Sequence, residues 1–409
     1  MTDDGTPGRG TTPGTPAQSP PASGTPPAAW PVEFIPTDDR AAPPADEIGL
    51  CLSGGGVRAM LFHAGALWRL NELGLLPRLD RVSSVSGGSI TAGVLATRWA
   101  SLAFDPASGV AANFVDAVVG PVRDLARRNI DVITAVKGML RPGSSPAREL
   151  ARTLDLHLYH GATLQDLPER PRFVFNATNL QSSVLWRFSR PYTWDWRVGK
   201  IENPTFGIAT AVASSSAFPP FFAPLQLDLD PASFVAGSGD GVLDRPEFQR
   251  RVLLADGGVY DNLGIETVFK RCRTVLVSDG GGRIDDAASP ATDWIREMLR
   301  VTKVIDNQVR SLRKRLLIQA LEGPDRDGAY WGIRSTIAEF PAPGALPVPD
   351  GVARELAEMP TRLASVPAGR QKALIDWGYA IADASIRSRY LPDARPPAGL
   401  PYPGALDRA

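Results

Sequence analysis

One serine and one aspartate stand where the sequence pattern can make them reactive. Ser86 follows a short apolar strand pattern at residues 81–85, and a helical pattern follows it at 89–99. A serine on a tight strand-to-helix turn projects from the sheet, and its crowded backbone requires small neighbours. We predict that Ser86 is the nucleophile of such an elbow. The usual spacing is G-x-S-x-G, and here Ser84 replaces the first glycine whereas Gly88 keeps the last.

A glycine turn earlier in the chain offers groups that can stabilise an anion. Gly54-Gly55-Gly56 follows an apolar run at residues 48–52 and precedes a helical pattern at 57–73. Successive glycine N–H groups form a concave anion site, and Arg58 adds a positive charge beside it. Acyl transfer needs such an oxyanion hole, because negative charge develops on the carbonyl oxygen in the transition state.

Simpler interpretations of both turns stay open. A lone glycine-rich turn after a strand is often a phosphate or dinucleotide loop, and Ser86 could be an ordinary helix N-cap. The nucleotide interpretation requires G-x-G-x-x-G or G-x-x-x-x-G-K-[ST]. Neither pattern is present, because Gly56 is followed by Val57, Arg58 and Ala59.

The base that would activate the serine is predicted from a strand end far downstream. The chain has three histidines, His63, His157 and His160, and none lies at a convincing strand end. An apolar run at residues 252–255 instead leads into Asp256, which is followed by Gly257 and Gly258. A carboxylate is a poor base unless desolvation raises its pKa, so a Ser–Asp dyad predicts an apolar, water-poor pocket. An aspartate turn, or a helix cap at Asp261 or Asn262, is the structural alternative.

The three motifs, G-G-G-V-R, S-V-S-G-G and D-G-G, resemble in this order the patatin-like phospholipases, which are lipid acyl hydrolases. The resemblance extends over residues 48–279 and includes the small-residue run and F-P-P turn at 211–220. It implies that Ser86 is the nucleophile, Asp256 its catalytic partner and Gly54–Gly56 with Arg58 the oxyanion-hole segment. Ser84 and Ala59 depart from the family pattern, but neither replaces a reacting group.

The fold we expect is a three-layer α/β/α sandwich with a largely parallel central sheet. The function we expect is hydrolysis of a lipid carboxylic ester through an acyl-enzyme on Ser86. A non-catalytic lipid-binding protein of the same fold and a small-ester carboxylesterase remain the alternatives. Head group, chain preference and oligomeric state are not predicted.

Composition limits the partners of the chain. Its 409 residues carry no formal net charge, which gives no electrostatic case for nucleic acid. Cys51 and Cys272 both lie in apolar runs and are expected to be core thiols. No spacing indicates a metal site or a cofactor, and no apolar run is long enough for a transmembrane helix. A lipid substrate is the expected partner, and cytoplasmic location is the default, with transient contact with a membrane surface left open.

Four segments are expected along the chain. Residues 1–45 are rich in Pro, Gly and Thr and are predicted to be disordered, and the catalytic domain covers 46–285. A mainly helical extension at 286–391 and a tail at 392–409 follow. Within the catalytic domain, the helical stretch 101–160 is a lid or a structural crossover, with no preference between them.

A long amphipathic helix is predicted at residues 292–321. Its apolar stripe recurs at helical spacing and consists of Trp294, Met298, Val301, Ile305, Val309, Leu312 and Leu316. Basic residues at 310 and 313–315 lie among them. We expect the stripe to pack on the sheet with the basic face in solvent, and contact with an anionic membrane is the alternative.

Overall fold

The structure is a computed structural model that describes residues 44–131, 144–219, 222–282 and 286–408. The described residues belong to one compact unit. The predicted N-terminal segment lies outside them except for Pro44 and Ala45, and Ala45 already begins the first strand. Residues 132–143 of the helical stretch predicted at 101–160 also lie outside the described residues.

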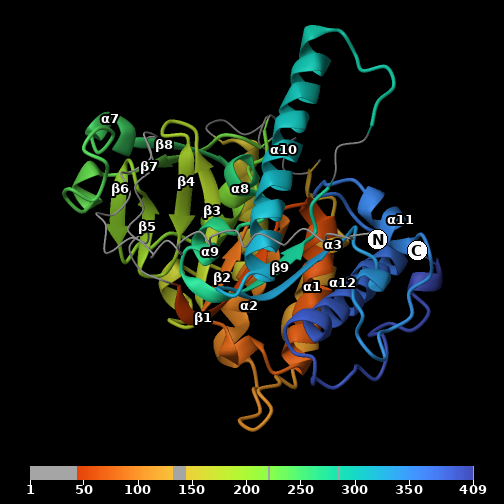
Figure 1. Ribbon diagram of the computed structural model, residues 1–409. Helices are drawn as coiled ribbons and strands as arrows, with labels where there is room; N and C mark the ends of the chain where they lie inside the picture. Colours follow the sequence, from red (N-terminus) through yellow and green to blue (C-terminus); the bar gives the residue numbers. More distant parts are fainter. Residues whose placement is uncertain (1–43, 132–143, 220–221, 283–285, 409) are drawn as a thin grey trace, which may run out of the picture. The chain divides into compact units, whose positions relative to one another are not determined.

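A ten-stranded sheet in the order β10-β9-β1-β2-β3-β4-β5-β6 forms the centre of this unit, with β8 beside β3 and β7 beside β8 (Figure 1). The parallel part consists of β1 (Ala45–Leu52), β2 (Arg81–Ser84), β3 (Arg172–Asn179), β9 (Cys272–Asp279) and β10 (Asp327–Gly332). The antiparallel part consists of β4 (Val184–Phe188), β5 (Tyr192–Asp195), β6 (Gly199–Glu202), β7 (Leu225–Asp228) and β8 (Arg251–Asp256). The predicted α/β class with a parallel centre is confirmed, and the antiparallel strands extend it beyond β3.

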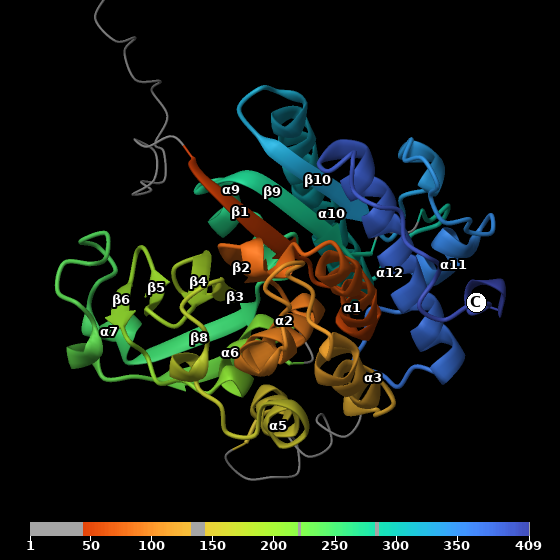
Figure 2. The ribbon, with the colours of Figure 1, turned by 90° about the horizontal axis from the view of Figure 1, so that it is seen from below.

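Helices cover both faces of the parallel part, as side-chain alternation along β1 requires. Leu50 and Leu52 point into one core, which they share with α1 (Gly56–Glu72), α2 (Gly87–Arg98), α6 (Ile208–Ser215) and α12 (Ala368–Arg389). Cys51 points the other way, into a smaller core with α9 (Glu266–Phe269) and Leu317 of α10 (Trp294–Glu322). Figure 2 shows the two layers on either side of the strands. The predicted three-layer sandwich is confirmed.

The stretch between α2 and β3 is partly helical and packs on the first layer. It contains π-helical turns at Val115–Val119 and Asp155–Tyr159, and α3 (Gly120–Ala126) and α5 (Pro146–Leu154). These elements contact α1, α2 and α6, so the described part of this stretch is a packed crossover. The remaining helices are short: α7 (Pro246–Gln249), α8 (Gly258–Asp261) and α11 (Val352–Glu358).

The segment predicted as a C-terminal extension is integrated into the same unit. It supplies β10 to the sheet, and α12 lies along α1 (Figure 2). A Cβ atom on Gly65 would stand 1.9 Å from the carbonyl oxygen of Ile375, and one on Gly378 would stand 2.0 Å from that of Phe62. Glycine at these two positions therefore lets the helices approach closely. The predicted boundary at residue 285 divides one compact unit.

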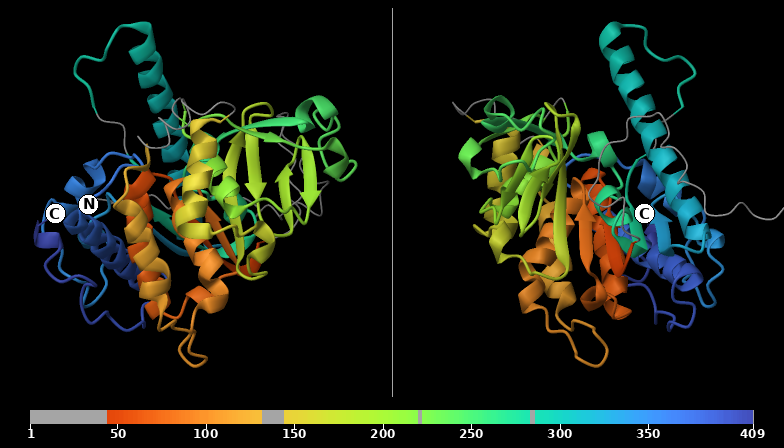
Figure 3. Two further views of the ribbon diagram at one scale, coloured as in Figure 1. Left: turned by 180° about the vertical axis from the view of Figure 1, so that it is seen from behind. Right: turned by 60° about the vertical axis from the view of Figure 1, so that its left-hand side comes forward.

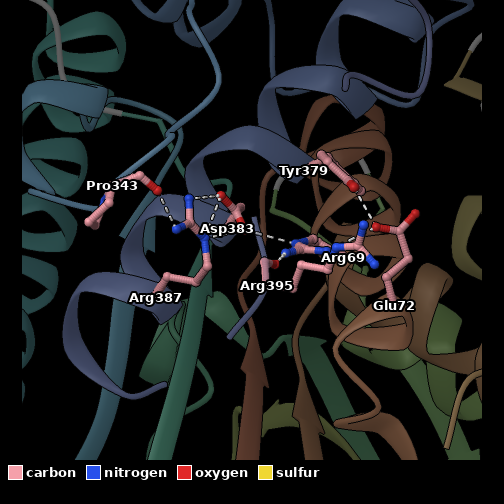
Figure 4. A network of polar contacts seen from close by, with 7 residues as sticks. All are labelled: Arg69, Glu72, Pro343, Tyr379, Asp383, Arg387 and Arg395. Atoms are coloured by element: carbon pink, nitrogen blue, oxygen red, sulfur yellow. Dashed lines mark hydrogen bonds and ion pairs between the residues drawn. The ribbon is translucent and has the colours of Figure 1, made fainter. Parts of the chain in front are cut away.

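A buried charge network closes this helix pair (Figure 4). The Asp383 carboxylate accepts hydrogen bonds from Arg69 Nε at 2.9 Å and from Arg387. Arg69 also donates to the carbonyl oxygen of Arg395 at 2.7 Å, which ties down the segment predicted as a tail. Breaking one partner of such a buried pair is expected to cost about 3–5 kcal/mol, because the other charge is left uncompensated.

The expected packing of the α10 stripe on the sheet is wrong. Trp294 is 70 % exposed and Leu316 is 53 % exposed, and Leu317 is the buried residue of this helix. The side that contacts the protein is basic. Arg313 donates to Glu266 at 3.0 Å, and Lys314 pairs with Asp279. Carboxylates at the sheet end therefore select the basic side of the helix and leave the apolar stripe outside.

Candidate active site

The turn after β2 holds Ser86 in a strained conformation. Its φ of 51° and ψ of −122° are unusual for a residue other than glycine. The next residues must be small, because a Cβ on Gly87 would stand 2.1 Å from the Gly56 carbonyl oxygen and one on Gly88 2.4 Å from that of Leu52. The two strand-to-helix turns thus pack directly against each other. Ser86 is half-buried, so a substrate can reach it.

A row of hydroxyl groups supports this elbow from behind. Ser89 donates to Ser84 at 2.9 Å and lies 2.8 Å from the hydroxyl of Ser215. Ser215 in turn accepts the backbone N–H of Ser86 at 3.0 Å. The serine at position 84, where the usual motif has glycine, is therefore bonded into the support of the elbow.

The geometry of β3 brings Asp256 to Ser86. Residues 172–175 of β3 pair with β2, and residues 177–179 pair with β8 on the same side, since β4 occupies the other side. Ser84 lies opposite Phe175 and Asp256 lies opposite Ala177. The ends of β2 and β8 therefore meet head-on along one edge of β3. The antiparallel approach of β8 was not foreseen from the sequence.

The carboxyl group of Asp256 is almost completely buried, with 2 % exposure. It accepts the N–H of Gly258 at 2.7 Å, and the Ser86 side chain lies close enough to affect its titration. Burial raises its pKa from 3.8 to about 7, although Gly258 and Ser86 both act in the opposite direction, and Asp306 of α10 raises it further. A carboxylate in this environment is a much stronger base than an exposed one.

The glycine turn after β1 presents unpaired N–H groups beside the elbow. Gly54 N–H donates to the carbonyl oxygen of Asn262 at 3.0 Å. Those of Gly55 and Gly56 have no acceptor among the residues that the structure describes. Gly55 has φ of 147°, and a Cβ there would stand 2.6 Å from the Gly280 carbonyl oxygen. The turn can therefore hold an anion only as glycine.

Gly87 is a further donor that the motif comparison did not single out. Its N–H also has no acceptor within the described ranges, and it directly follows Ser86. In strand-to-helix elbows this N–H is a frequent part of the oxyanion hole. The sequence could have indicated this donor, because Gly87 is the residue that directly follows the proposed nucleophile in the motif.

Arg58 lies beside the glycine turn and is engaged by backbone carbonyl groups. Its guanidinium is 2 % exposed and donates to the carbonyl oxygens of Ala357 at 2.6 Å, Met359 at 2.7 Å and Gly280 at 3.0 Å. Both terminal nitrogens are therefore engaged by backbone. Arg58 therefore ties the start of α1 to the C-terminal segment and to the glycine turn at residues 280–282, and these contacts brace the Gly54–Gly56 turn.

The third glycine turn, which follows β9, braces the first. Gly280 N–H donates to the Ser53 hydroxyl at 2.8 Å. Asp279 precedes it and is buried, and its ion pair with Lys314 holds the pKa of its carboxyl well below the usual range. These contacts join residues that are distant in the chain.

His63 is a buried part of this bracing. Its Nε2 lies 2.9 Å from the Ser53 carbonyl oxygen, and its Nδ1 lies 2.8 Å from the hydroxyl of Ser278. Burial lowers its pKa to about 4, so the ring is neutral at neutral pH, donates from Nε2 and accepts at Nδ1. His157 and His160 lie at the end of a different helical segment. No hydrogen bond between any of the three and Ser86 occurs in the described structure.

Apolar side chains near the site differ in their exposure. Phe218 is 59 % exposed and Val259 is 50 % exposed, so each can contribute to an apolar rim. Phe222 is partly buried against the core, whereas Phe221 lies outside the described residues.

Among the side chains that the structure describes, no group of three His, Cys, Asp or Glu could hold a metal ion. None of the described helices is both long and apolar enough to cross a membrane.

Part of the chain matches the model of a known protein family. The sequence profile of the family described as patatin-like phospholipase matches residues 50–269, more than half of the chain. The match contains both strand-to-helix turns and the end of β8. No curated protein matches the chain.

Solved structures of low sequence identity are similar to this chain. Human GIVD cytosolic phospholipase A2 is 13 % identical with a TM-score of 0.46, over 84 % of this chain and 61 % of that one. The same human protein in complex with methyl gamma-linolenyl fluorophosphonate is 15 % identical with a TM-score of 0.44, over 86 % and 59 %. VipD from Legionella pneumophila is 15 % identical with a TM-score of 0.34, over 82 % and 66 %. This chain thus spans less than two thirds of the length of these structures.

Proposed function

This chain belongs to the patatin-like phospholipase family, and from that premise we propose that it hydrolyses carboxylic esters of lipids through an acyl-enzyme. Ser86 is the proposed nucleophile and Asp256 the proposed base. The N–H groups of Gly55 and Gly56, with that of Gly87, are the proposed oxyanion hole. Location in the cytoplasm remains a prediction from sequence.

The proposed reaction has two halves. Asp256 takes the proton of the Ser86 hydroxyl while the serine oxygen attacks the ester carbonyl carbon, and the glycine N–H groups stabilise the resulting oxyanion. The intermediate expels the alcohol, which receives the proton from Asp256, and the acyl group stays on Ser86. Water then gives a proton to Asp256 and attacks the acyl-enzyme. Collapse of this second intermediate releases the fatty acid, and the proton returns to Ser86.

One observation carries the proposal: β3 holds the buried Asp256 next to Ser86, on a turn with positive φ, and the Ser86 side chain is close enough to lower the pKa of that carboxyl. An N-cap serine would use its hydroxyl to accept an N–H of the following helix turn. Ser86 makes no such bond, so a capping role does not account for its conformation. Burial of Asp256 supports the proposal, because a carboxylate base requires a water-poor environment.

Turnover of Ser86→Ala tests the proposal. We expect the wild-type chain to hydrolyse long-chain phospholipids and a soluble short-chain ester, and Ser86→Ala to lose both activities while its circular dichroism and melting temperature stay unchanged. Ser108→Ala, which alters an exposed loop serine, is the matched control and should keep full activity. Undiminished turnover by folded Ser86→Ala would overturn the assignment.

The substrates used in the same assay separate the alternatives. A protein that hydrolyses only short acyl chains is a small-ester carboxylesterase. A protein that binds phospholipid but reacts with neither substrate is a non-catalytic lipid-binding member of the fold. A panel of head groups and acyl chains then defines the lipid class, which the described contacts do not specify.

A further inference from the structure

Half of α10 projects beyond the edge of the sheet at which Ser86 lies. Lys314 pairs with Asp279, the last residue of β9, and Arg310 donates to the carbonyl oxygen of Gly282 just after it. Leu317, further along the helix, packs into the sheet with Val275. The helix therefore runs antiparallel to β9. Its residues before Arg310 extend beyond the edge of the sheet that the carboxyl ends of the parallel strands form. Trp294–Val309 is about 24 Å long at the usual rise per residue, and Figures 1 and 3 show it standing clear of the other helices.

The projecting half of α10, Trp294–Val309, is covered with exposed apolar side chains. Trp294 is 70 % exposed, and Met298 and Ile305 are each 57 % exposed. Exposed large apolar residues of this segment also include Ile295, Leu299, Val301, Val304 and Val309. A soluble surface rarely leaves so many neighbouring large apolar side chains without a partner. We therefore expect these apolar side chains to be in contact with a partner surface when the protein is active.

The distribution of these residues distinguishes a lipid surface from a second copy of the helix. A coiled-coil partner covers one stripe, here Trp294, Met298, Val301 and Ile305. Ile295, Leu299 and Val304 lie off that stripe, at about 100°, 140° and 280° around the helix from Trp294, and they are exposed as well. Lipid that surrounds the end of a helix can cover all of these directions, whereas a single partner helix cannot.

The charge of the projecting half also favours a lipid surface as the partner. In the projecting half the basic residues Arg296, Arg300 and Lys303 outnumber the acidic Glu297 and Asp306. Long basic side chains among apolar ones suit the boundary between acyl chains and anionic head groups, where tryptophan is also favoured.

The apolar surface also continues at the rim of the site. Arg313 of α10 stacks on Tyr260 of α8 with its guanidinium carbon 5.4 Å from the ring centre. Val259, next to Tyr260, is exposed and follows the proposed base closely in the chain. Asp306, inside the projecting half, is near enough to raise the pKa of Asp256. The projecting half and the proposed catalytic groups therefore lie at one end of the sheet.

We propose that the projecting half of α10 docks the enzyme on anionic lipid surfaces and thereby presents Ser86 to the lipid. The choice of lipid as the partner rests on the proposed lipid acyl hydrolase function. Docking by α10 and turnover at Ser86 are separate properties, because the docking residues do not contact the reacting groups.

Binding to vesicles tests this proposal without involving turnover. The full chain carrying Ser86→Ala is sedimented with vesicles of phosphatidylcholine and phosphatidylserine, and compared with the same chain carrying Trp294→Gln, Met298→Gln and Ile305→Gln as well. We expect the additional substitutions to weaken partition into the vesicles at least tenfold. The matched control changes three exposed apolar residues elsewhere, Leu156→Gln, Leu180→Gln and Val242→Gln, and should bind like the parent. Arg296→Gln with Lys303→Gln should weaken binding to anionic vesicles and leave binding to pure phosphatidylcholine unchanged.

Outcomes of these measurements either support or overturn the inference. Equal vesicle binding by the parent and the α10 variant, or no binding by the parent, would overturn it. A dimer of the parent that dissociates in the α10 variant, with vesicle binding unchanged, would assign the surface to a second copy instead. A chain that carries the three α10 substitutions but retains the native Ser86 should hydrolyse a soluble short-chain ester at the wild-type rate. Failure of wild-type turnover on that ester would count against the proposed function alone.

Discussion

Asp256→Asn should stabilise the folded protein at alkaline pH while it abolishes turnover. Burial raises the pKa of Asp256 from 3.8 to about 7. Above that pH the folded protein holds an ionised carboxylate in an environment that favours the neutral acid. Asparagine has the same shape, keeps an oxygen for the N–H of Gly258 and carries no charge. The substitution therefore removes the cost of ionisation with little change in packing.

The size of the effect follows from the difference in pKa between the two states. Because the pKa is raised in the folded state, the folded protein holds one more proton on Asp256 than the unfolded chain between pH 3.8 and about 7. Wild-type stability therefore falls as pH rises through this window, by about 1.4 kcal/mol per pH unit from this group. Across the whole window the loss is on the order of 4 kcal/mol, and the asparagine variant does not have it.

Urea unfolding of the two proteins between pH 4 and pH 9 measures this effect. Contributions from all other titrating groups cancel in the difference between their free energies of unfolding. We expect the difference to be small near pH 4, to grow in favour of Asp256→Asn up to about pH 7, and to stay constant above it. A difference that does not change with pH would refute the reasoning, because it would mean that Asp256 titrates like an exposed carboxyl.

Three further predictions concern turnover on a soluble short-chain ester. The value of kcat/KM should fall about tenfold per pH unit below about pH 7, since only ionised Asp256 is a base, and a limb near pH 4 would exclude this assignment. Gly55→Ala should lower kcat by roughly 10²–10³ with little change in KM, because the added Cβ would press on the Gly280 carbonyl group and displace the proposed oxyanion donors. A change in KM alone would indicate that the turn is a binding loop. His63→Gln should lower the melting temperature yet keep most of the turnover and the same pH profile, and His157→Gln and His160→Gln should change neither; a folded but inactive histidine variant would indicate a triad.

Local motifs in the sequence were sufficient to single out Ser86 and Asp256, which the structure brings together along one edge of β3. Each lies at a strand end next to glycine, and such patterns are short and contiguous. The parallel centre of the sheet followed from the order of strands and helices. The head-on meeting of β2 and β8 could not be predicted, since it depends on the register of both with β3 and not on either segment alone.

Contacts between distant segments account for what the sequence did not indicate. Arg58 was expected beside an oxyanion, but its partners lie at Gly280, Ala357 and Met359, and no local pattern indicates them. The stripe of α10 has the periodicity of a packed helix, and periodicity alone does not say what covers the apolar side. Ion pairs with the buried Asp279 and the half-buried Glu266 bring the basic side of this helix into contact with the protein.

Covalent labelling with a fluorophosphonate, followed by mass spectrometry of the peptides, tests the central claim most directly. A fluorophosphonate reacts with a serine only where the hydroxyl is activated, so it reports the proposed pair before any choice of lipid is made. We predict a single adduct on Ser86 in the wild-type chain, and at least a hundredfold slower labelling in folded Asp256→Asn, in line with the effect of general base catalysis. An adduct on a different serine, or labelling of Asp256→Asn at the wild-type rate, would contradict the account.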